Sequence, residues 1–160
     1  MSKCISFGFW SHAEEFLSAA NSLKDPKSSH RGEEVFKLIL PAYYLVGHSI
    51  ELSLKSYLAA KGYTLNDLRA KKYGHILESL LNEARKRKIG REVKLSKQQV
   101  KDVKLLNKAY NSKKFEYLEY GDYKLLKYGY IYETAECLLK GLARYASNSP
   151  FNKTLQRTSR

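Results

Sequence analysis

Residues 41–62 read PAYYLVGHSIELSLKSYLAAKG, and this stretch decides the fold. Its apolar residues recur at intervals of three and four, the period of an α-helix that is buried along most of its surface. His48, Glu51 and Lys55 stand at positions i, i+3 and i+7, so these polar side chains share one face of that helix. An unpaired polar group inside a protein costs about 1–3 kcal/mol. The sequence therefore predicts a helix whose polar face meets partners from other segments.

The composition indicates one folded domain. The chain has 160 residues, of which 43% are hydrophobic and 12% aromatic, enough for a single hydrophobic core. No apolar run reaches the roughly 20 residues that cross a bilayer, and the N-terminus lacks the apolar core of a signal peptide. We therefore expect a cytoplasmic protein that does not enter a membrane. Cys4 and Cys137 have no metal-ligand spacing and no Gly-rich phosphate loop is present, so we expect no metal and no cofactor.

Helical periodicity extends over most of the chain. It predicts the all-α fold class, as a single-domain up-and-down bundle of four to five helices over residues 1–146, with a disordered tail over residues 147–160. The helices predicted from the apolar pattern are residues 9–23, 33–61, 75–88, 97–110 and 128–145.

Local signals refine these boundaries. Pro41 falls inside the second predicted helix, where it predicts a kink or a break. Ser96 is a suitable N-cap for the fourth helix. Residues 63–74 are predicted to form a connection, and residues 111–127 an irregular loop that is rich in tyrosine. No internal repeat and no second domain boundary is visible.

Positive charge is concentrated in one part of the sequence. The net charge is +13, and residues 69–114 contain fifteen Lys or Arg against four acids. This asymmetry suggests an anionic partner such as nucleic acid, although a solvated face that keeps the protein soluble is an alternative. Seven of the thirteen tyrosines fall between Tyr110 and Tyr132, and rings beside cations are typical of single-strand binding as well as of helix packing. The candidate nucleic-acid-binding residues are Arg85, Arg87, Arg91, Lys97, Lys101, Lys104 and Lys108.

The order of several motifs resembles the HEPN family of small helical domains from bacteria and archaea. FWSHAEEFLSAANSL at residues 9–23 is similar to the family's opening helix. HSIELSLKSYLAAKG at residues 48–62 is similar to its central H-x-x-E-x-x-x-K segment, and GHILESLL at residues 74–81 to its Gly/Thr-His-x-Leu helix start. A loop that contains tyrosine and a final helix follow in the expected order. The resemblance covers roughly residues 9–145.

The resemblance implies a bundle that usually dimerises, often through its long helices. Many members act on RNA or accompany a nucleotidyltransferase in toxin–antitoxin and defence systems, so the expected partners are a second copy, RNA or a nucleotide, and a nucleotidyltransferase. Ribonuclease members carry an Arg followed four to six residues later by a His near the start of the last main helix. This chain departs from that pattern, because its histidines are His12, His30, His48 and His75.

Two interpretations of the His and Arg residues therefore stay open. Arg69 and His75 have the permitted spacing, although they precede the third helix, and together with His48 they are the candidate catalytic residues of a metal-independent ribonuclease. The other interpretation is an internal polar network, made of His48, Glu51, Lys55 and His75. The sequence favours a helical domain that binds nucleic acid or nucleotide without the usual ribonuclease motif. A ribonuclease toxin and an interaction module paired with a nucleotidyltransferase are the alternatives.

Overall fold

The computed structural model describes residues 2–23, 39–112 and 127–147, and every regular element in these ranges is helical. The predicted all-α class is confirmed for this part of the chain. Six α-helices and one 3-10 helix are present there, one α-helix more than the sequence led us to expect. They are α1 (Ser2–Ser22), α2 (Ile39–Ala60), α3 (Leu65–Arg69), α4 (Leu77–Lys86), the 3-10 helix η1 (Ile89–Arg91), α5 (Lys97–Asn111) and α6 (Tyr128–Ser147).

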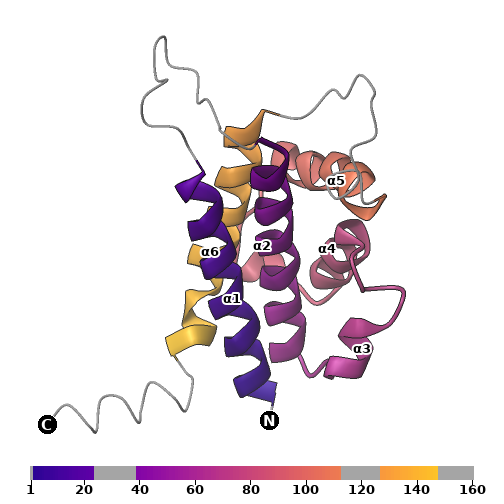
Figure 1. Ribbon diagram of the computed structural model, residues 1–160. Coiled ribbons are helices and arrows are strands. Elements are labelled where there is room, and N and C mark those ends of the chain that lie inside the picture. The colour runs from indigo at the N-terminus through magenta and orange to yellow at the C-terminus, as the bar shows by residue number, and fades with distance from the viewer. Residues whose placement is uncertain (1, 24–38, 113–126, 148–160) are drawn as a thin grey trace, which may run out of the picture.

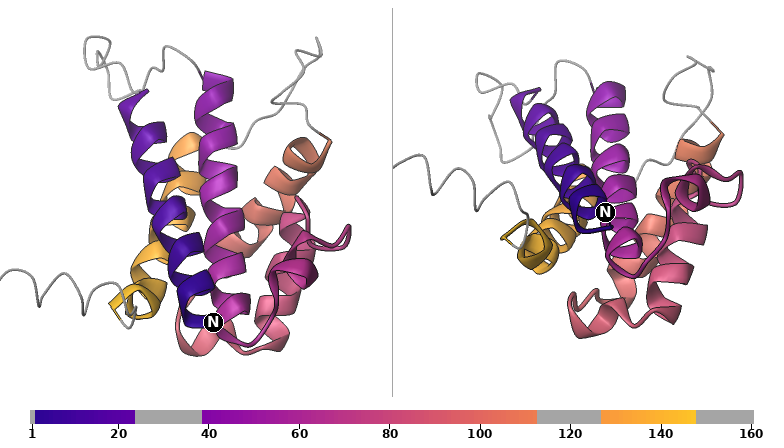
Figure 2. Two further views of the ribbon diagram at one scale, coloured as in Figure 1. Left: turned by 60° about the horizontal axis from the view of Figure 1, so that its bottom comes forward. Right: turned by 90° about the horizontal axis from the view of Figure 1, so that it is seen from below.

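Helix α2 is the centre of the fold. Helices α1 and α6 pack along one side of it and α4 along the other, with α5 packed on α4 (Figures 1 and 2). Residues 49–59 of α2 are all buried, and Ile50, Leu54 and Leu58 have no exposed surface. A helix that is enclosed on nearly all sides tolerates polar residues only where they find partners. The polar residues on the buried face of α2 therefore need hydrogen-bond or ion-pair partners from neighbouring segments.

Helix α1 is fixed to α2 by reciprocal hydrogen bonds as well as by apolar contact. The Ser6 Oγ donates to the Ser56 carbonyl at 2.9 Å, and the Ser56 Oγ donates to the Ser6 carbonyl at 2.7 Å. Further along, the Ser49 Oγ donates to the Ala13 carbonyl at 2.7 Å. The contacts between Ser6 and Ser56 hold the first turns of α1, which begins well before the start that the apolar pattern predicts. Long-range contacts of this kind leave no periodic signal in the sequence.

Two helix starts carry a reciprocal capping box. The Ser96 Oγ accepts from the Gln99 backbone N–H at 3.1 Å, and the Gln99 side chain accepts from the Ser96 N–H at 2.9 Å, so the predicted cap of α5 is confirmed. Thr64 and Asp67 form the same arrangement at the start of α3. Helix α3 lies within residues 63–74, which the sequence led us to expect as a plain connection.

The remaining boundaries differ by a few residues from those expected. Pro41 lies in the first turn of α2, where its missing N–H is not needed, so no kink follows from it. Residues 33–38, most of the tyrosine-rich loop, and residues 148–160 of the expected tail lie outside the described residues. None of the helices in the described ranges is long and apolar enough to span a bilayer.

Candidate functional site

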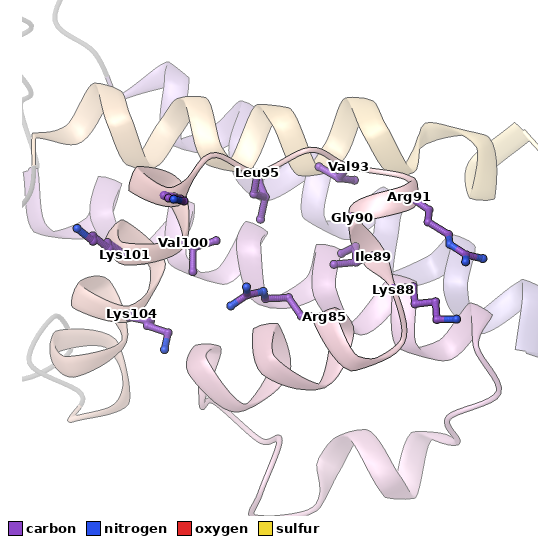
Figure 3. A pocket seen from close by; sticks show the side chains of 11 residues that line it. Arg85, Lys88, Ile89, Gly90, Arg91, Val93, Leu95, Val100, Lys101 and Lys104 are labelled. Carbon is purple, nitrogen blue, oxygen red and sulfur yellow. The ribbon is translucent and has the colours of Figure 1, made fainter.

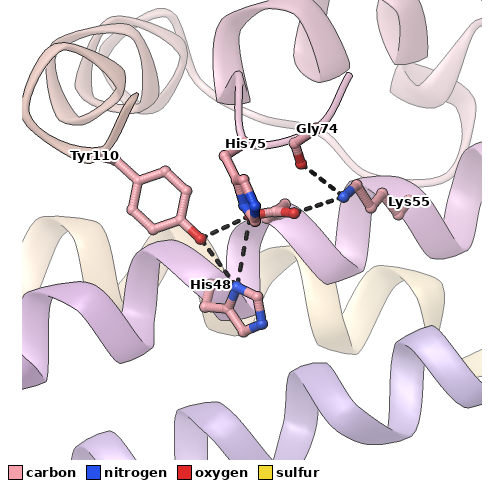
Figure 4. A network of polar contacts seen from close by, with 6 residues as sticks. His48, Lys55, Gly74, His75 and Tyr110 are labelled. Atoms are coloured by element: carbon pink, nitrogen blue, oxygen red, sulfur yellow. Dashed lines mark hydrogen bonds and ion pairs between the residues drawn. The ribbon is translucent and has the colours of Figure 1, made fainter. Parts of the chain in front are cut away.

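The polar face of α2 meets other segments at a single carboxylate (Figure 4). Glu51 is 1% exposed. Its Oε1 accepts a hydrogen bond from Lys55 Nζ at 2.6 Å, and its Oε2 accepts from Tyr110 Oη at 2.6 Å. His75 Nδ1 lies 3.1 Å from Oε2, and Lys55 Nζ also donates to the Gly74 carbonyl at 2.7 Å. Helix α2, helix α5 and the segment before α4 are thus joined through one side chain.

The charge of Glu51 is stabilised in spite of its burial. Burial by itself raises the pKa of this carboxyl group, but the hydrogen bond from His48, the charge and hydrogen bond of Lys55, and the hydrogen bond of Tyr110 outweigh it and lower the pKa to about 2. Glu51 is therefore ionised at neutral pH. We refer below to His48, Glu51, Lys55, His75 and Tyr110 as the Glu51 network.

The positions of the protons follow from the ionised carboxylate, which only accepts hydrogen bonds. Tyr110 therefore directs its proton to Glu51. The His48 Nδ1–H lies between two acceptors, with the Tyr110 Oη at 2.9 Å and the Glu51 Oε2 at 3.5 Å from the nitrogen. The His75 Nδ1 carries a proton for the same reason. The four residues that the sequence placed in a polar network are brought together, and Tyr110 is added to them.

Tyr110 belongs to the buried side of α5, and its hydroxyl completes the Glu51 network. Its side chain is buried, and its ring lies directly against α2 at Gly47, where a Cβ would lie 2.8 Å from the Tyr110 Cδ2. Phe16 and Tyr44 flank the His48 imidazole with centroid distances of 4.4 and 5.9 Å. The glycine beside His48 is the feature of the sequence that could have indicated the close approach.

Arg69 and His75, which the sequence offers as candidate catalytic residues, are not joined by a hydrogen bond or ion pair between their side chains in the described part of the chain. Arg69 is exposed at the end of α3. The side chain of His75 is 64% exposed, so its imidazole reaches solvent while its Nδ1 is held by Glu51. In the same ranges, no group of three or more His, Cys, Asp or Glu residues is suited to hold a metal ion.

Basic residues of α4, η1 and α5 line a pocket of about 700 Å³ (Figure 3). Ile89 and Val93 contribute apolar lining that is almost fully buried, and Leu95 and Val100 are half-buried beside them. None of the described side chains that line the pocket is acidic. We call it the basic pocket; its cations are Arg85, Lys88, Arg91, Lys97, Lys101 and Lys104.

The backbone around the basic pocket is fixed by two local features. Lys88 adopts a left-handed conformation, with φ 67° and ψ 38°, and this turns the chain out of α4 into η1. Farther along, Val93 packs against α6 at Gly141, where a Cβ would lie 2.5 Å from the Val93 Cγ2. The segment between α4 and α5 is thus held against α6, and cations of the pocket lie on both sides of it.

Two of the seven predicted nucleic-acid-binding residues do not line the basic pocket. The Arg87 Nε donates to the Glu83 Oε1 at 3.3 Å, and the Arg87 guanidinium donates to the Tyr63 Oη at 3.0 Å. The Tyr63 hydroxyl donates to the same carboxylate oxygen at 2.7 Å. Arg87 therefore fastens the end of α4 to the residues that follow α2. Lys108 is exposed farther along α5, outside the pocket lining.

The acids nearest to the basic pocket are engaged elsewhere. Glu92 forms an ion pair with Arg144 of α6, and Asp102 is buried, with its Oδ1 accepting from Gln98. Lys104 is paired, with its Nζ 3.1 Å from the Glu78 Oε1. The other five cations of the pocket form no ion pair with any described residue. Their charge is therefore left for a ligand or for solvent ions.

The described ranges thus offer two candidate sites of opposite character. The polar groups of the Glu51 network are paired with one another, and His75 is its residue with a mostly exposed side chain. The basic pocket is open, and most of its charge is not neutralised. No protein-family model, no curated protein and no solved structure matches this chain.

Proposed function

We propose that this chain is a HEPN-like helical domain that binds nucleic acid through the basic pocket. The observation that carries the proposal is the composition of the pocket, whose described lining has six cations, no acid and a single ion pair. Like charges that are held together repel one another, and an anionic ligand relieves this repulsion. A nucleic-acid backbone is such a ligand, because it presents successive phosphates that several cations contact together.

The pocket lining favours recognition of phosphates over recognition of bases. Among the described residues, its uncharged surface is aliphatic and glycine, and no aromatic ring contributes to it. Base stacking on aromatic rings is what single-strand binding sites use to hold bases. Binding at this pocket is therefore expected to be nearly independent of nucleotide sequence and strongly dependent on salt.

The family assignment and the dimer rest on the resemblance of the sequence motifs. Those motifs fall in α1, in α2 and at the start of α4, which pack on one another through α2. A dimer in solution would agree with the resemblance, and sedimentation measurements would check it. Co-purification of a nucleotidyltransferase without retention of RNA would instead favour the interaction module.

The binding proposal is tested with a labelled oligouridylate titrated at several salt concentrations. If six cations each contact one phosphate, log K should fall with log salt at a slope of about −4, since each contact with a single strand contributes about 0.7. The double variant Lys97→Glu with Lys101→Glu should lower the affinity by at least about 25-fold at 0.1 M salt, from the loss of two such contacts.

A matched control separates the pocket from net charge. Lys71→Glu with Lys140→Glu makes the same charge change at exposed positions on the α3–α4 connection and on α6. This control should keep most of the affinity. Equal losses in the two double variants would show that binding depends on overall charge, and unchanged affinity in the pocket variant would remove the pocket from the proposal.

A second candidate function, ribonuclease activity, is favoured by one specific observation. The exposed imidazole of His75 is held at Nδ1 by the ionised carboxylate of Glu51, at 3.1 Å. A carboxylate in this position fixes the tautomer in which Nε2 is free to accept a proton, as a general base requires. His75 precedes α4, and the ten residues from there to Arg85 correspond to about 15 Å if helical throughout. A strand bound in the basic pocket could therefore extend to it.

The two candidate functions are separated by measuring cleavage and binding on the same RNA. His75→Ala should abolish cleavage and leave binding in the basic pocket intact. His48→Ala serves as the comparison, because its imidazole belongs to the same network but is largely enclosed. Cleavage that persists in His75→Ala would exclude His75, and binding without any cleavage by the unmodified protein would favour the first function alone.

A further inference from the structure

Lys88 has a backbone conformation that residues other than glycine rarely adopt. Its φ of 67° and ψ of 38° place it in the left-handed region, and no other non-glycine residue of the described ranges has a positive φ. In this region the Cβ approaches the backbone carbonyl oxygen. The position directly after a helix C-cap, where Lys88 stands, is for this reason usually occupied by glycine.

The end of α2 shows what the same protein does at an equivalent turn. Gly62 stands two residues after the last residue of α2, as Lys88 stands two residues after the last residue of α4, and its φ is 98°. A Cβ at Gly62 would meet no atom within 4 Å, so backbone conformation and not space accounts for the glycine. Glycine is thus used at one turn and lysine at the other.

Contacts within the described part of the protein do not explain why residue 88 is a lysine and not a glycine. The side chain of Lys88 is exposed, and it forms no hydrogen bond or ion pair with a described residue. A cation near a helix C-terminus interacts favourably with the helix dipole. The last turn of α4 already holds Arg85 and Lys86, however, so this role does not require a further cation in a strained conformation.

We propose that Lys88 is a phosphate-contacting residue of the basic pocket, and that the left-handed turn is retained because it presents the Lys88 ammonium there. The inference rests on the proposed nucleic-acid binding and gives the left-handed turn at this residue a role in it. Lys88 lines the pocket together with Arg85 of α4 and Arg91 of η1. Figure 3 shows the Lys88 side chain extending next to that of Arg91, at one end of the pocket. Strained backbone conformations persist at ligand sites where they position a functional group.

The test uses three substitutions at this position, with thermal unfolding and oligouridylate binding as measurements. Lys88→Gly should raise the melting temperature by about 2–4 °C, because it relieves the left-handed conformation in a domain of this size. It should also weaken binding by about fivefold at 0.1 M salt and reduce the salt slope by about 0.7, the contribution of one phosphate contact. Lys88→Ala should weaken binding equally without raising the melting temperature, and Lys88→Arg should keep both properties.

A control at the other turn calibrates the backbone effect. Gly62→Ala should lower the melting temperature and leave oligouridylate binding unchanged, since Gly62 is not among the residues that line the basic pocket. Full affinity and an unchanged salt slope in both Lys88→Gly and Lys88→Ala would overturn the inference. If those variants bind fully while Lys97→Glu with Lys101→Glu does not, the proposed function stands and only the role of Lys88 falls.

Discussion

The Glu51 network and the basic pocket both border α4 and α5, but the charges of the network are paired and most charges of the pocket are not. In the network, the carboxylate of Glu51 lies 2.6 Å from the ammonium of Lys55. The Tyr110 hydroxyl donates to the same carboxylate, and His48 lies within hydrogen-bond distance of that hydroxyl. In the pocket, five of the six cations have no ion-pair partner among the described residues. Both regions border α4 and α5, so the difference does not arise from a difference in the surrounding helices.

The fold requires the paired charges of the network but not the unpaired charges of the pocket. A charge inside a protein has to be paired, because an uncompensated buried ion is strongly destabilising. A charge at the surface is tolerated without a partner, but a cluster of equal charges gains nothing in stability from being together. The network therefore accounts for how the helices stay in register, whereas the pocket retains charge that folding does not need.

The largest change in the free energy of unfolding is expected when the Glu51 network loses the Glu51 carboxylate. Glu51→Ala leaves the Lys55 ammonium buried with the Gly74 carbonyl as its remaining acceptor. Removal of one partner of a buried pair costs about 3–5 kcal/mol, and urea unfolding measures the loss. Glu136→Ala removes the partner of Lys140 in an exposed pair and should cost less than about 1 kcal/mol. Similar losses in the two variants would contradict the view that the Glu51 network is structurally required.

Acid should weaken the paired region next. The pKa of Glu51 is lowered from its ordinary value of 4.5 to about 2, so its ionisation contributes stability that is fully present above pH 4.5 and is lost as the pH falls toward 2. A difference of this size corresponds to roughly 3 kcal/mol. Glu51→Gln cannot titrate. The difference in unfolding free energy between the unmodified protein and Glu51→Gln should therefore shrink between pH 6 and pH 2, and a constant difference would contradict this.

A smaller effect is expected from crowding the network without removing a charge. Gly47→Ala places a Cβ 2.8 Å from the Tyr110 Cδ2, so the buried ring and its hydrogen bond to Glu51 have to shift. Overpacking of this kind costs about 1–3 kcal/mol, partly offset by the better helix propensity of alanine. Gly8→Ala in α1 meets no atom within 4 Å and should be neutral or stabilising. Equal stability of the two variants would show that Tyr110 moves without loss.

The paired region was largely predictable from local sequence. The helical period of α2 and the spacing of His48, Glu51 and Lys55 fix a shared face, and burial then demands partners for it. Tyr110 was not predictable as one of those partners. Nothing in the pattern of α5 distinguishes a tyrosine whose hydroxyl meets a carboxylate from one that fills space, and the contact depends on the small residue at Gly47.

The basic pocket was predictable in part, because helical spacing also determines which lysines of α5 share a face. The spacing of Lys97, Lys101 and Lys104 at intervals of four and three places them on one face of α5, and the pocket contains all three. Arg87 shares their charge but is directed to Glu83, because the end of α4 packs beside Tyr63. Such assignments depend on which helices become neighbours. That information is not contained in the local period.

The smallest expected effect lies in the basic pocket itself. Lys101→Gln removes one cation from a cluster of unpaired cations, so it should leave the unfolding free energy unchanged or raise it by up to about 0.5 kcal/mol at low salt. The gain should disappear at high salt, because ions screen exposed charges from one another. Lys140→Gln is the matched control: it removes a cation that is paired with Glu136, so it should give a small loss instead. A loss for Lys101→Gln as large as that of the control would mean that Lys101 is paired in solution, and the contrast between the two regions would then weaken.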